Sequence, residues 1–219
     1  MNMNSFVETE APPSSSLTIS SVKRIHGRAC LYLSNGEVLS MPRAMLKERP
    51  YRGGMPFDLT SHRTFLNERS YPFAIEKAVA LLASRARTEK EIVDALRRNA
   101  YPETTIARVM QRLNEAGYVN DKEFAEHWAA SRTNKGLGTR RIRMELYRKG
   151  VDPDDIDNVL SAVDQDEVFQ GAVKSAEKAA RGKDLSDPAA RQRIIAYLAR
   201  RGYDFSMARQ AVEHILSQN

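Results

Sequence analysis

Residues 139–163 read TRRIRMELYRKGVDPDDIDNVLSAV, and this stretch decides the fold. Ile142 and Leu146 are spaced so that both lie on one face of a helix, and Gly150 is a residue type that commonly ends one. Asp152-Pro153 is a typical helix start, because the carboxylate caps free amide groups and proline fits the first turn. The stretch therefore predicts a helix, a tight turn and a second helix.

The same pattern of apolar and turn positions occurs three times along the chain. The middle copy contains Ile142, Leu146, Gly150, Val151, Ile156, Val159 and Val163. Fifty residues earlier the equivalent positions are Ile92, Leu96, Ala100, Tyr101, Ile106, Val109 and Leu113. After an insertion of about two residues, the pattern returns as Ile194, Leu198, Gly202, Tyr203, Ala208, Ala211 and Ile215. Each copy follows a further helical stretch, at residues 73–84, 122–133 and 165–181, so the sequence predicts three tandem three-helix repeats.

Helix start and stop signals agree with this division. Thr88 with Glu91 forms a capping box, which is a reciprocal pairing of side chains and amide groups at a helix start. The other expected N-caps are Asp121, Asp152, Asp187 and Asp204, and the expected helix ends are Gly117, Gly150 and Gly202. We expect the repeats to occupy residues 73–120, 121–163 and 164–219.

Residues 17–72 have a different pattern. Val22–Ile25, Ala29–Leu33 and Glu37–Leu39 are typical of strands, and Asn35-Gly36 favours a two-residue type I′ hairpin turn. A short helix is expected around residues 43–48, and the rest of this stretch is a connector or the closing part of the β module. The polar, acidic residues 1–16 are expected to be a disordered tail. The predicted fold is mainly α, with three helix-turn-helix-like repeats after a small N-terminal β-hairpin module.

Composition narrows the class of protein. The chain has 219 residues, of which 42% are hydrophobic and 28% charged, and its net charge is +6, a balance typical of a soluble globular protein. No apolar run approaches the roughly 20 residues that a membrane span needs, and the N-terminus lacks the features of a secretory signal. Cys30 is the one cysteine, which excludes an internal disulfide. We expect a monomer in the cytoplasm.

No motif predicts an enzyme, a cofactor or a metal site. The histidines are His26, His62, His127 and His214, and none has a partner at metal-ligand spacing. Gly136-Leu137-Gly138 lacks a preceding strand and a following Gly-Lys-Ser/Thr, so a turn is favoured over a phosphate loop. The acidic residues from Asp152 to Asp157 lack the order of a calcium loop and are better explained by helix capping. Trp128 and Phe124 have helical spacing, which favours core packing over a base-stacking platform.

A basic segment in the middle repeat is the candidate binding site. Its proposed contact residues are Arg132, Lys135, Arg140, Arg141, Arg143, Tyr147, Arg148 and Lys149. On a helical wheel, Arg140, Arg143, Met144 and Tyr147 lie opposite the face formed by Ile142 and Leu146. Two interpretations stay open: the face binds a partner, or Met144 and Tyr147 pack against a neighbouring repeat while the arginines are solvated.

The middle repeat also resembles a known family. The residues that carry the resemblance are Gly117-Tyr118-Val119-Asn120-Asp121, Phe124-Ala125, Ala130-Ser131-Arg132, Lys135-Gly136-Leu137-Gly138, Arg141-Ile142, Glu145-Leu146 and Lys149-Gly150-Val151. They resemble RecX regulatory proteins, most strongly over residues 73–163. The resemblance implies tandem three-helix units and a non-enzymatic role in recombination, DNA repair and the SOS response.

The resemblance also implies the partner. RecX proteins bind the filament that the RecA recombinase forms on single-stranded DNA, and they limit its ATPase, extension and strand exchange. Some also bind DNA, so single-stranded or double-stranded DNA is a further expected partner. The alternative function is a helix-turn-helix-like protein that acts mainly through its own nucleic-acid contacts.

Overall fold

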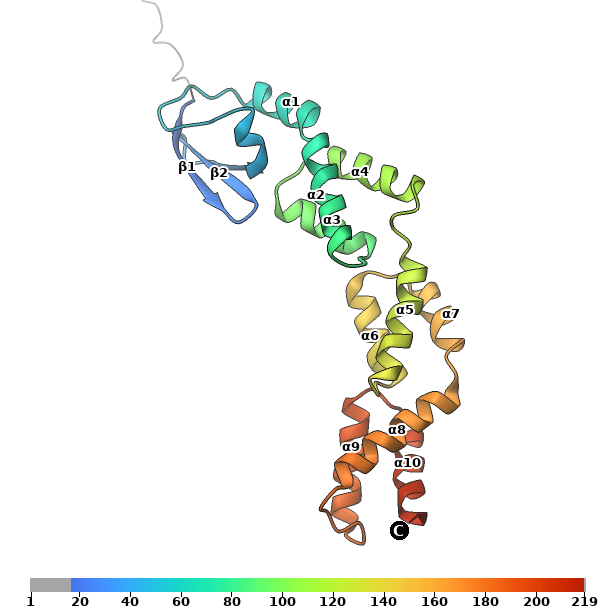
Figure 1. The fold of residues 1–219 in the computed structure, drawn as a ribbon. Coiled ribbons are helices and arrows are strands. Elements are labelled where there is room, and N and C mark those ends of the chain that lie inside the picture. The colour runs from blue at the N-terminus through green and yellow to red at the C-terminus, as the bar shows by residue number, and fades with distance from the viewer. Residues whose placement is uncertain (1–16, 219) are drawn as a thin grey trace, which may run out of the picture. The chain divides into compact units, whose positions relative to one another are not determined.

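The computed structural model of the chain describes residues 17–218 and confirms the predicted fold class (Figure 1). In the described residues, a three-stranded antiparallel sheet is followed by ten α-helices. The chain forms two compact units. The first contains the chain up to Ala78 together with Ala95–Val109, and the second contains Val79–Asp94 together with the chain from Met110 onward.

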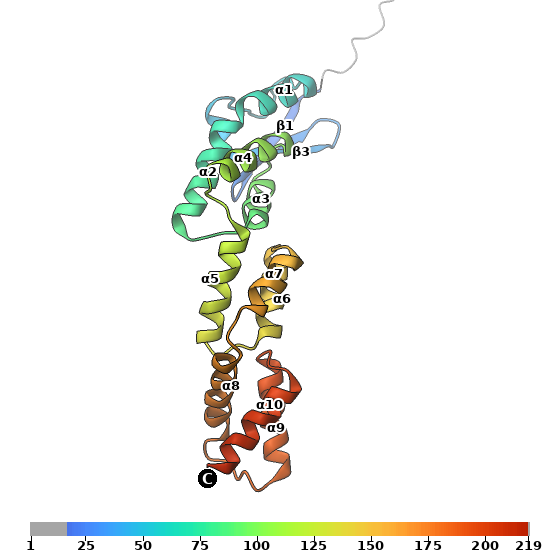
Figure 2. The same ribbon diagram turned by 90° about the vertical axis from the view of Figure 1, so that its right-hand side faces the viewer.

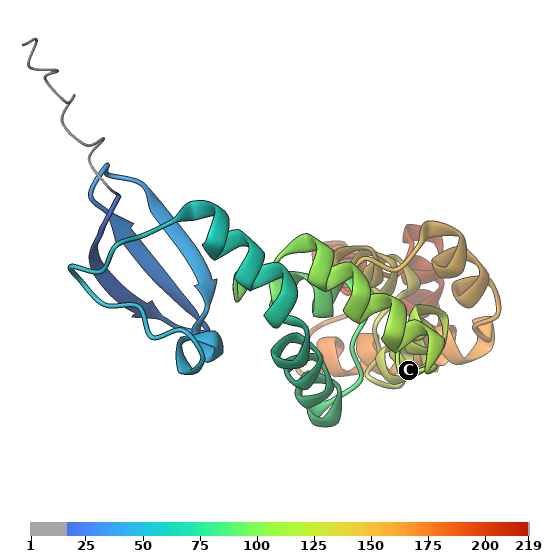
Figure 3. The ribbon, with the colours of Figure 1, turned by 90° about the horizontal axis from the view of Figure 1, so that it is seen from above.

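The N-terminal sheet has the order β1 (Ile19–Ile25), β2 (Arg28–Leu33) and β3 (Val38–Pro42). Its inner face packs against a short 3-10 helix, η1 (Arg43–Lys47), and against α1 (Leu59–Arg69), which Figure 3 shows beside the sheet. The core of this module contains Leu31 and Met41 from the sheet, Met45 from η1 and Leu66 from α1. Helix α1 lies in the stretch expected to be a connector or the closing part of the β module, and its Leu66 makes it part of that module. The helix itself was not predicted, because it buries only His62 and Leu66 and therefore has little apolar periodicity.

The turn between β2 and β3 differs from the predicted type I′ turn. Leu33 N–H donates to the carbonyl of Glu37 at 2.9 Å, so three residues lie in the loop rather than two. Only Gly36, at φ 88°, has a positive φ, whereas a type I′ turn requires two such residues. The loop has the pattern of a turn followed by a left-handed glycine, which is the usual way to close a three-residue hairpin.

The helices form three consecutive groups. The first group is α2 (Tyr71–Ser84), α3 (Glu89–Arg98) and α4 (Glu103–Glu115); the second is α5 (Asp121–Asn134), α6 (Thr139–Lys149) and α7 (Pro153–Ser161); the third is α8 (Gln165–Ala180), α9 (Pro188–Arg200) and α10 (Phe205–Ser217). The six residues aligned at the start of the repeat pattern are all fully buried: Ile92, Leu96, Ile142, Leu146, Ile194 and Leu198. The repeat alignment therefore identified the core face of each middle helix, while the residue limits proposed for the repeats remain a prediction.

Most predicted helix caps are present, with one correction. Asp152, Asp187 and Asp204 each accept a hydrogen bond from an amide in the first turn that follows. The cap of α5 is Asn120, whose side chain accepts from the Glu123 amide, and not Asp121 as predicted. Asp121 Oδ1 instead accepts from the Glu89 amide at 2.9 Å, at the start of α3. The side chain therefore stabilises a helix start in the preceding repeat.

Two equivalent joints connect consecutive middle helices within the second unit. The Gly138 amide donates to the Arg201 carbonyl at 3.0 Å, where the end of α9 meets the start of α6 (Figure 2). In the same way, Thr88 Oγ1 donates to the Lys149 carbonyl at 2.7 Å, where the end of α6 meets the start of α3. Since residues 88 and 138 are equivalent in the repeat, the chain uses one joint twice.

Candidate partner-binding surface on the second repeat

The buried face of α6 packs against the other two helices of the second repeat. Ile142 and Leu146 are fully buried against a core that includes Phe124 of α5 and Ile156 of α7. Trp128 packs against this core as predicted, with its ring stacked on Phe124 at a centroid distance of 5.5 Å. This packing fixes the rotation of α6, and with it the residues that α6 presents on its opposite side.

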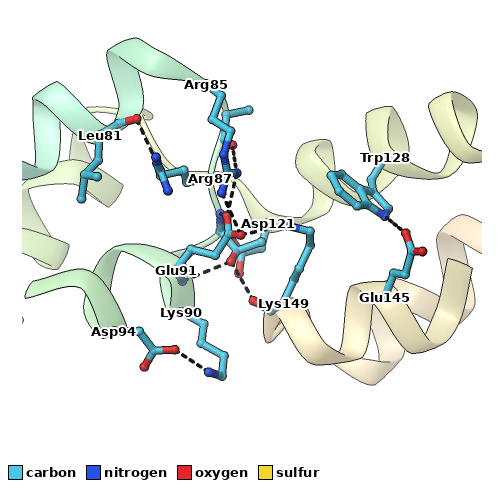
Figure 4. Close-up of polar contacts among 12 residues, drawn as sticks. Leu81, Arg85, Arg87, Lys90, Glu91, Asp94, Asp121, Trp128, Glu145 and Lys149 are labelled. Carbon is cyan, nitrogen blue, oxygen red and sulfur yellow. Dashed lines mark hydrogen bonds and ion pairs between the residues drawn. The ribbon is translucent and has the colours of Figure 1, made fainter. Parts of the chain in front are cut away.

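A polar cluster next to this core uses two of the predicted contact residues. Glu145 accepts hydrogen bonds from Trp128 Nε1 at 3.1 Å, from Arg132 Nε at 2.8 Å and from Arg141 Nε at 3.2 Å. Figure 4 shows the contact between Trp128 and Glu145. Burial by itself raises the pKa of Glu145, but the hydrogen bonds from Arg132 and Arg141 outweigh it, and the pKa lies below its ordinary value. Arg132 also lies 3.9 Å above the Trp128 ring, so this arginine stabilises the repeat.

Lys149 is similarly engaged inside the protein. Its Nζ lies 2.7 Å from Glu91 Oε1 and 4.3 Å from the centre of the Trp128 ring (Figure 4). Burial alone raises the pKa of Glu91, but hydrogen bonds from Arg85 and Lys149 hold it at about 2. Lys149 therefore connects α6 to α3, and its ammonium group is not presented to a partner.

The opposite side of α6 is exposed and has a mixed cationic and apolar character. We call it the α6 outer face, and it consists of Arg140, Arg143, Met144, Tyr147 and Arg148. Met144 is 47% exposed and Tyr147 68% exposed, so the interpretation in which they pack against a neighbouring repeat is wrong. Arg143 forms an ion pair with the exposed Asp157. Within residues 17–218, Arg140 and Arg148 form no ion pair.

The eight predicted contact residues thus fall into two groups. Arg140, Arg143, Tyr147 and Arg148 lie together on the α6 outer face, and Lys135 is exposed in the turn before α6. Arg132, Arg141 and Lys149 make ion pairs within the second unit. The wheel identified the side of α6 opposite its buried face, but spacing alone did not separate the cations on that side from those that pair with Glu145 within the repeat or with Glu91 of the preceding repeat.

The loop at Gly136-Leu137-Gly138 is a turn covered by the third repeat. Arg201 donates from its guanidinium to the carbonyls of Lys135 and Gly136 at 2.7 and 2.8 Å, and the Arg140 amide donates to the Gly202 carbonyl at 3.1 Å. A Cβ added at Gly138 would lie 2.3 Å from the Gly202 backbone, so the joint requires glycine at this position. The start of α6 is therefore occupied by protein groups.

The sequence reading missed a second group of cations, on the third repeat. Lys174 and Lys178 on α8, with Arg193 and Arg200 on α9, are all exposed. They form no dense basic run in the sequence, so only their helical spacing and the packing of α8 on α9 bring them together. Among the described residues, no helix has the length and apolar character needed to cross a membrane.

Comparison with known proteins agrees with this architecture. Residues 74–113, 120–160 and 165–212 match the first, second and third three-helix domains of RecX. Regulatory protein RecX of Mycolicibacterium vanbaalenii is 39% identical over 136 residues, which are 58% of this chain and 74% of that protein. Regulatory protein RecX of Bacillus velezensis is 37% identical over 148 residues, which are 67% of this chain and 56% of that protein.

Solved RecX structures have the same fold. A crystal structure of regulatory protein RecX matches with a TM-score of 0.59 and 21% identity over 87% of this chain and 96% of its own. RecX from Lactobacillus salivarius matches with a TM-score of 0.60 and 22% identity over 66% of this chain and 96% of its own. The first match covers more than the three helical domains, so the structural likeness extends into the N-terminal module. The three tandem domains and these relatives show that the chain belongs to the RecX family of regulatory proteins.

Proposed function

We propose that this chain is a non-enzymatic regulator of the RecA recombinase. It binds the RecA filament on single-stranded DNA through the α6 outer face and limits ATP hydrolysis, filament extension and strand exchange. Membership of a family of proteins named as regulatory supports this role. The partner itself is inferred from the family and not from the geometry of α6.

The α6 outer face is the observation on which the proposed contact rests. Tyr147 is 68% exposed, so most of its side chain is open to a partner. Tyrosine, methionine and arginine are the residue types enriched at the centres of protein interfaces. Since Tyr147 and Met144 lie between Arg140 and Arg148, a partner with an apolar pocket bordered by acidic groups would complement this face.

The alternative, in which α6 reads DNA as a helix-turn-helix recognition helix, has less support. Recognition helices contact base edges with their N-terminal residues. In this chain the Arg140 amide, in the first turn of α6, already donates to the Gly202 carbonyl, and Gly138 lies directly against Gly202. The third repeat therefore occupies backbone groups at the start of α6, whereas the outer side of α6, including the Arg140 side chain, is exposed.

The test is RecA-dependent ATP hydrolysis on single-stranded DNA, with the chain added at increasing concentration. We expect Arg140→Glu/Arg148→Glu to raise the concentration needed for half-maximal inhibition by about thirtyfold, since truncating charged interface anchors commonly costs about 2 kcal/mol or more. The control is Arg112→Glu/Lys122→Glu, which makes the same charge change at exposed residues of α4 and α5. Equal inhibition by both variants and the wild type, with all three folded, would refute the proposed surface.

A further inference from the structure

The ends of the three middle helices are equivalent docking points in the repeat. Asn99, Lys149 and Arg201 each directly precede the residue of positive φ that ends the helix. The Lys149 carbonyl accepts from Thr88 Oγ1 at the start of α3. The Arg201 carbonyl accepts from the Gly138 amide at the start of α6. Within residues 17–218 no repeat precedes the first one, so a different element has to cover the equivalent point at Asn99.

The turn between β1 and β2 lies against Asn99. A Cβ added at Gly27 would overlap the Asn99 side-chain amide, so the backbone of this hairpin turn contacts the end of α3. The Gly27 carbonyl accepts from the Arg43 amide at 2.9 Å, which connects the turn to the start of η1. Gly27 and Asn99 both belong to the first compact unit. The hairpin therefore takes the place that the start of a preceding middle helix takes at the later joints.

The conformation of this turn shows why residue 27 is a glycine. Ile25 pairs with Arg28, so His26 and Gly27 form a two-residue loop. His26 has a φ of 52°, whereas Gly27 does not have a positive φ. Tight hairpin turns normally place glycine where φ is positive. Since the glycine here occupies the other position, the close approach to Asn99 requires it and the turn conformation does not.

A second contact lies where the end of α1 meets the start of α4 (Figure 1). Ser70, which ends α1, and Thr105 of α4 are both buried, and their hydroxyl oxygens are 2.7 Å apart. Next to them, Thr104 Oγ1 donates to Asn67 Oδ1 at 3.2 Å. Leu66 of α1 belongs to the core of the β module, so these hydrogen bonds connect that core to the first repeat. The module is thus held both at the end of α3 and at the start of α4.

From these contacts we infer that the end of the first repeat is a docking surface for a β-hairpin, and that the N-terminal module fills it and caps the array of repeats. In tandem repeat proteins each unit is stabilised by its neighbours, so a terminal unit needs a cap. The partner that fits this surface is a tight turn without a Cβ at its point of contact. This role of the β module is separate from the proposed RecA contact on α6.

Hydrogen–deuterium exchange of the full chain, followed by mass spectrometry, tests this docking. The amides of Asn99, Ala100 and Tyr101 are hydrogen-bonded at the end of α3. Gly27→Leu should raise their exchange rate, and that of the β1–β2 hairpin, by about tenfold or more, because the new side chain separates the turn from Asn99. Exchange at Gly150, the equivalent helix end of the second repeat, should change by less than about twofold. Unchanged exchange around Asn99 would overturn the inference.

A double-mutant cycle separates docking from any effect on the turn itself. Gly27→Ala should raise exchange around Asn99 by about threefold, since the Asn99 amide must then leave its hydrogen bond to the Ala95 carbonyl or the turn must move. In an Asn99→Ala background the same substitution should have no further effect, because the atoms that a Cβ at residue 27 would meet are gone. Equal increases in both backgrounds would overturn the inference. If Gly27→Leu unfolded the whole chain, the alanine variants would still decide. RecA is absent from the assay, so its outcome is independent of the proposed RecA contact.

Discussion

The residues that end the three middle helices provide a quantitative test of the repeat architecture. Ala100, Gly150 and Gly202 are equivalent in the repeat and have φ values of 62°, 86° and 96°. Placing a residue with a Cβ in this left-handed region lowers stability by about 1–2 kcal/mol. Glycine avoids this cost but loses more conformational entropy than alanine on folding, which is worth about 0.5–1 kcal/mol. Ala100→Gly should therefore increase the free energy of unfolding by about 0.5–1 kcal/mol.

Gly150→Ala and Gly202→Ala should both lower the free energy of unfolding, but by different amounts, because the two glycines have different neighbours. A Cβ at Gly150 would lie 2.4 Å from Lys90 Cδ and 2.5 Å from Lys90 Cβ, so the start of α3 has to shift together with the lysine side chain. A Cβ at Gly202 would lie 2.4 Å from the Arg141 backbone nitrogen, so α6 and α9 would have to separate. Separation would also break two backbone hydrogen bonds of the joint, each worth about 0.5–1.5 kcal/mol. We expect losses of about 2 kcal/mol for Gly150→Ala and about 3 kcal/mol for Gly202→Ala.

Urea unfolding of the full chain, followed by circular dichroism, measures these differences. A gain of about 1 kcal/mol for Ala100→Gly corresponds to an increase of about 2–4 °C in the thermal midpoint of a chain this size. The order from most to least stable should be Ala100→Gly, wild type, Gly150→Ala and Gly202→Ala. If Ala100→Gly destabilised the protein, or if Gly202→Ala had no effect, the alignment of the three helix ends would be wrong.

Three further predictions concern single residues. Leu146→Asp should abolish cooperative thermal unfolding, since burying an unpaired carboxylate costs several kcal/mol against a total stability of about 5–15 kcal/mol; an unchanged melting curve would contradict the core assignment. Burial, with Arg49 and Arg63 nearby, lowers the pKa of His62 to about 4, so the unfolded chain takes up a proton between pH 6.5 and 4 that the folded chain does not. Stability present above pH 6.5 should thus fall toward pH 4 by about 3 kcal/mol, and NMR titration should find the imidazole neutral at pH 6. Glu91, whose pKa is about 2 in the folded chain, contributes stability that is present above its unfolded pKa of about 4.5 and is lost as the pH falls toward 2. Glu91→Gln should therefore reduce the difference between urea midpoints at pH 5 and pH 3, and an unreduced difference would argue against the contact with Lys149.

Apolar periodicity was sufficient to locate the cores of the repeats. Ile142 and Leu146 are fully buried because one face of a helix must be removed from water, and that requirement is local in sequence. The same argument placed Met144 and Tyr147 opposite this buried face, and the structure decides between the two open interpretations by showing both residues exposed. Helix α1 was missed because it buries two residues only, which is too few to produce a periodic signal.

Contacts between residues that are far apart in the sequence could not be predicted from local sequence patterns. Lys149 and Glu91 are 58 residues apart, so their ion pair depends on how the joint packs and not on their spacing. Asp121 and Asn120 are both good capping residues, and tertiary structure decided which one caps α5. The exposed cations of α8 and α9 are likewise spread between Lys174 and Arg200, and only the packing of the two helices brings them close together.

Photocrosslinking from the α6 outer face is the most direct test of the proposed RecA contact. A benzophenone amino acid replaces Tyr147, which keeps an aromatic ring at this 68% exposed position, and the protein is irradiated with RecA filaments assembled on single-stranded DNA. The control carries the same group in place of Phe205 on α10, which is 56% exposed. We expect a covalent adduct with RecA from position 147 and little or none from position 205. An adduct from position 205 with none from position 147 would contradict the assignment of the RecA contact to α6.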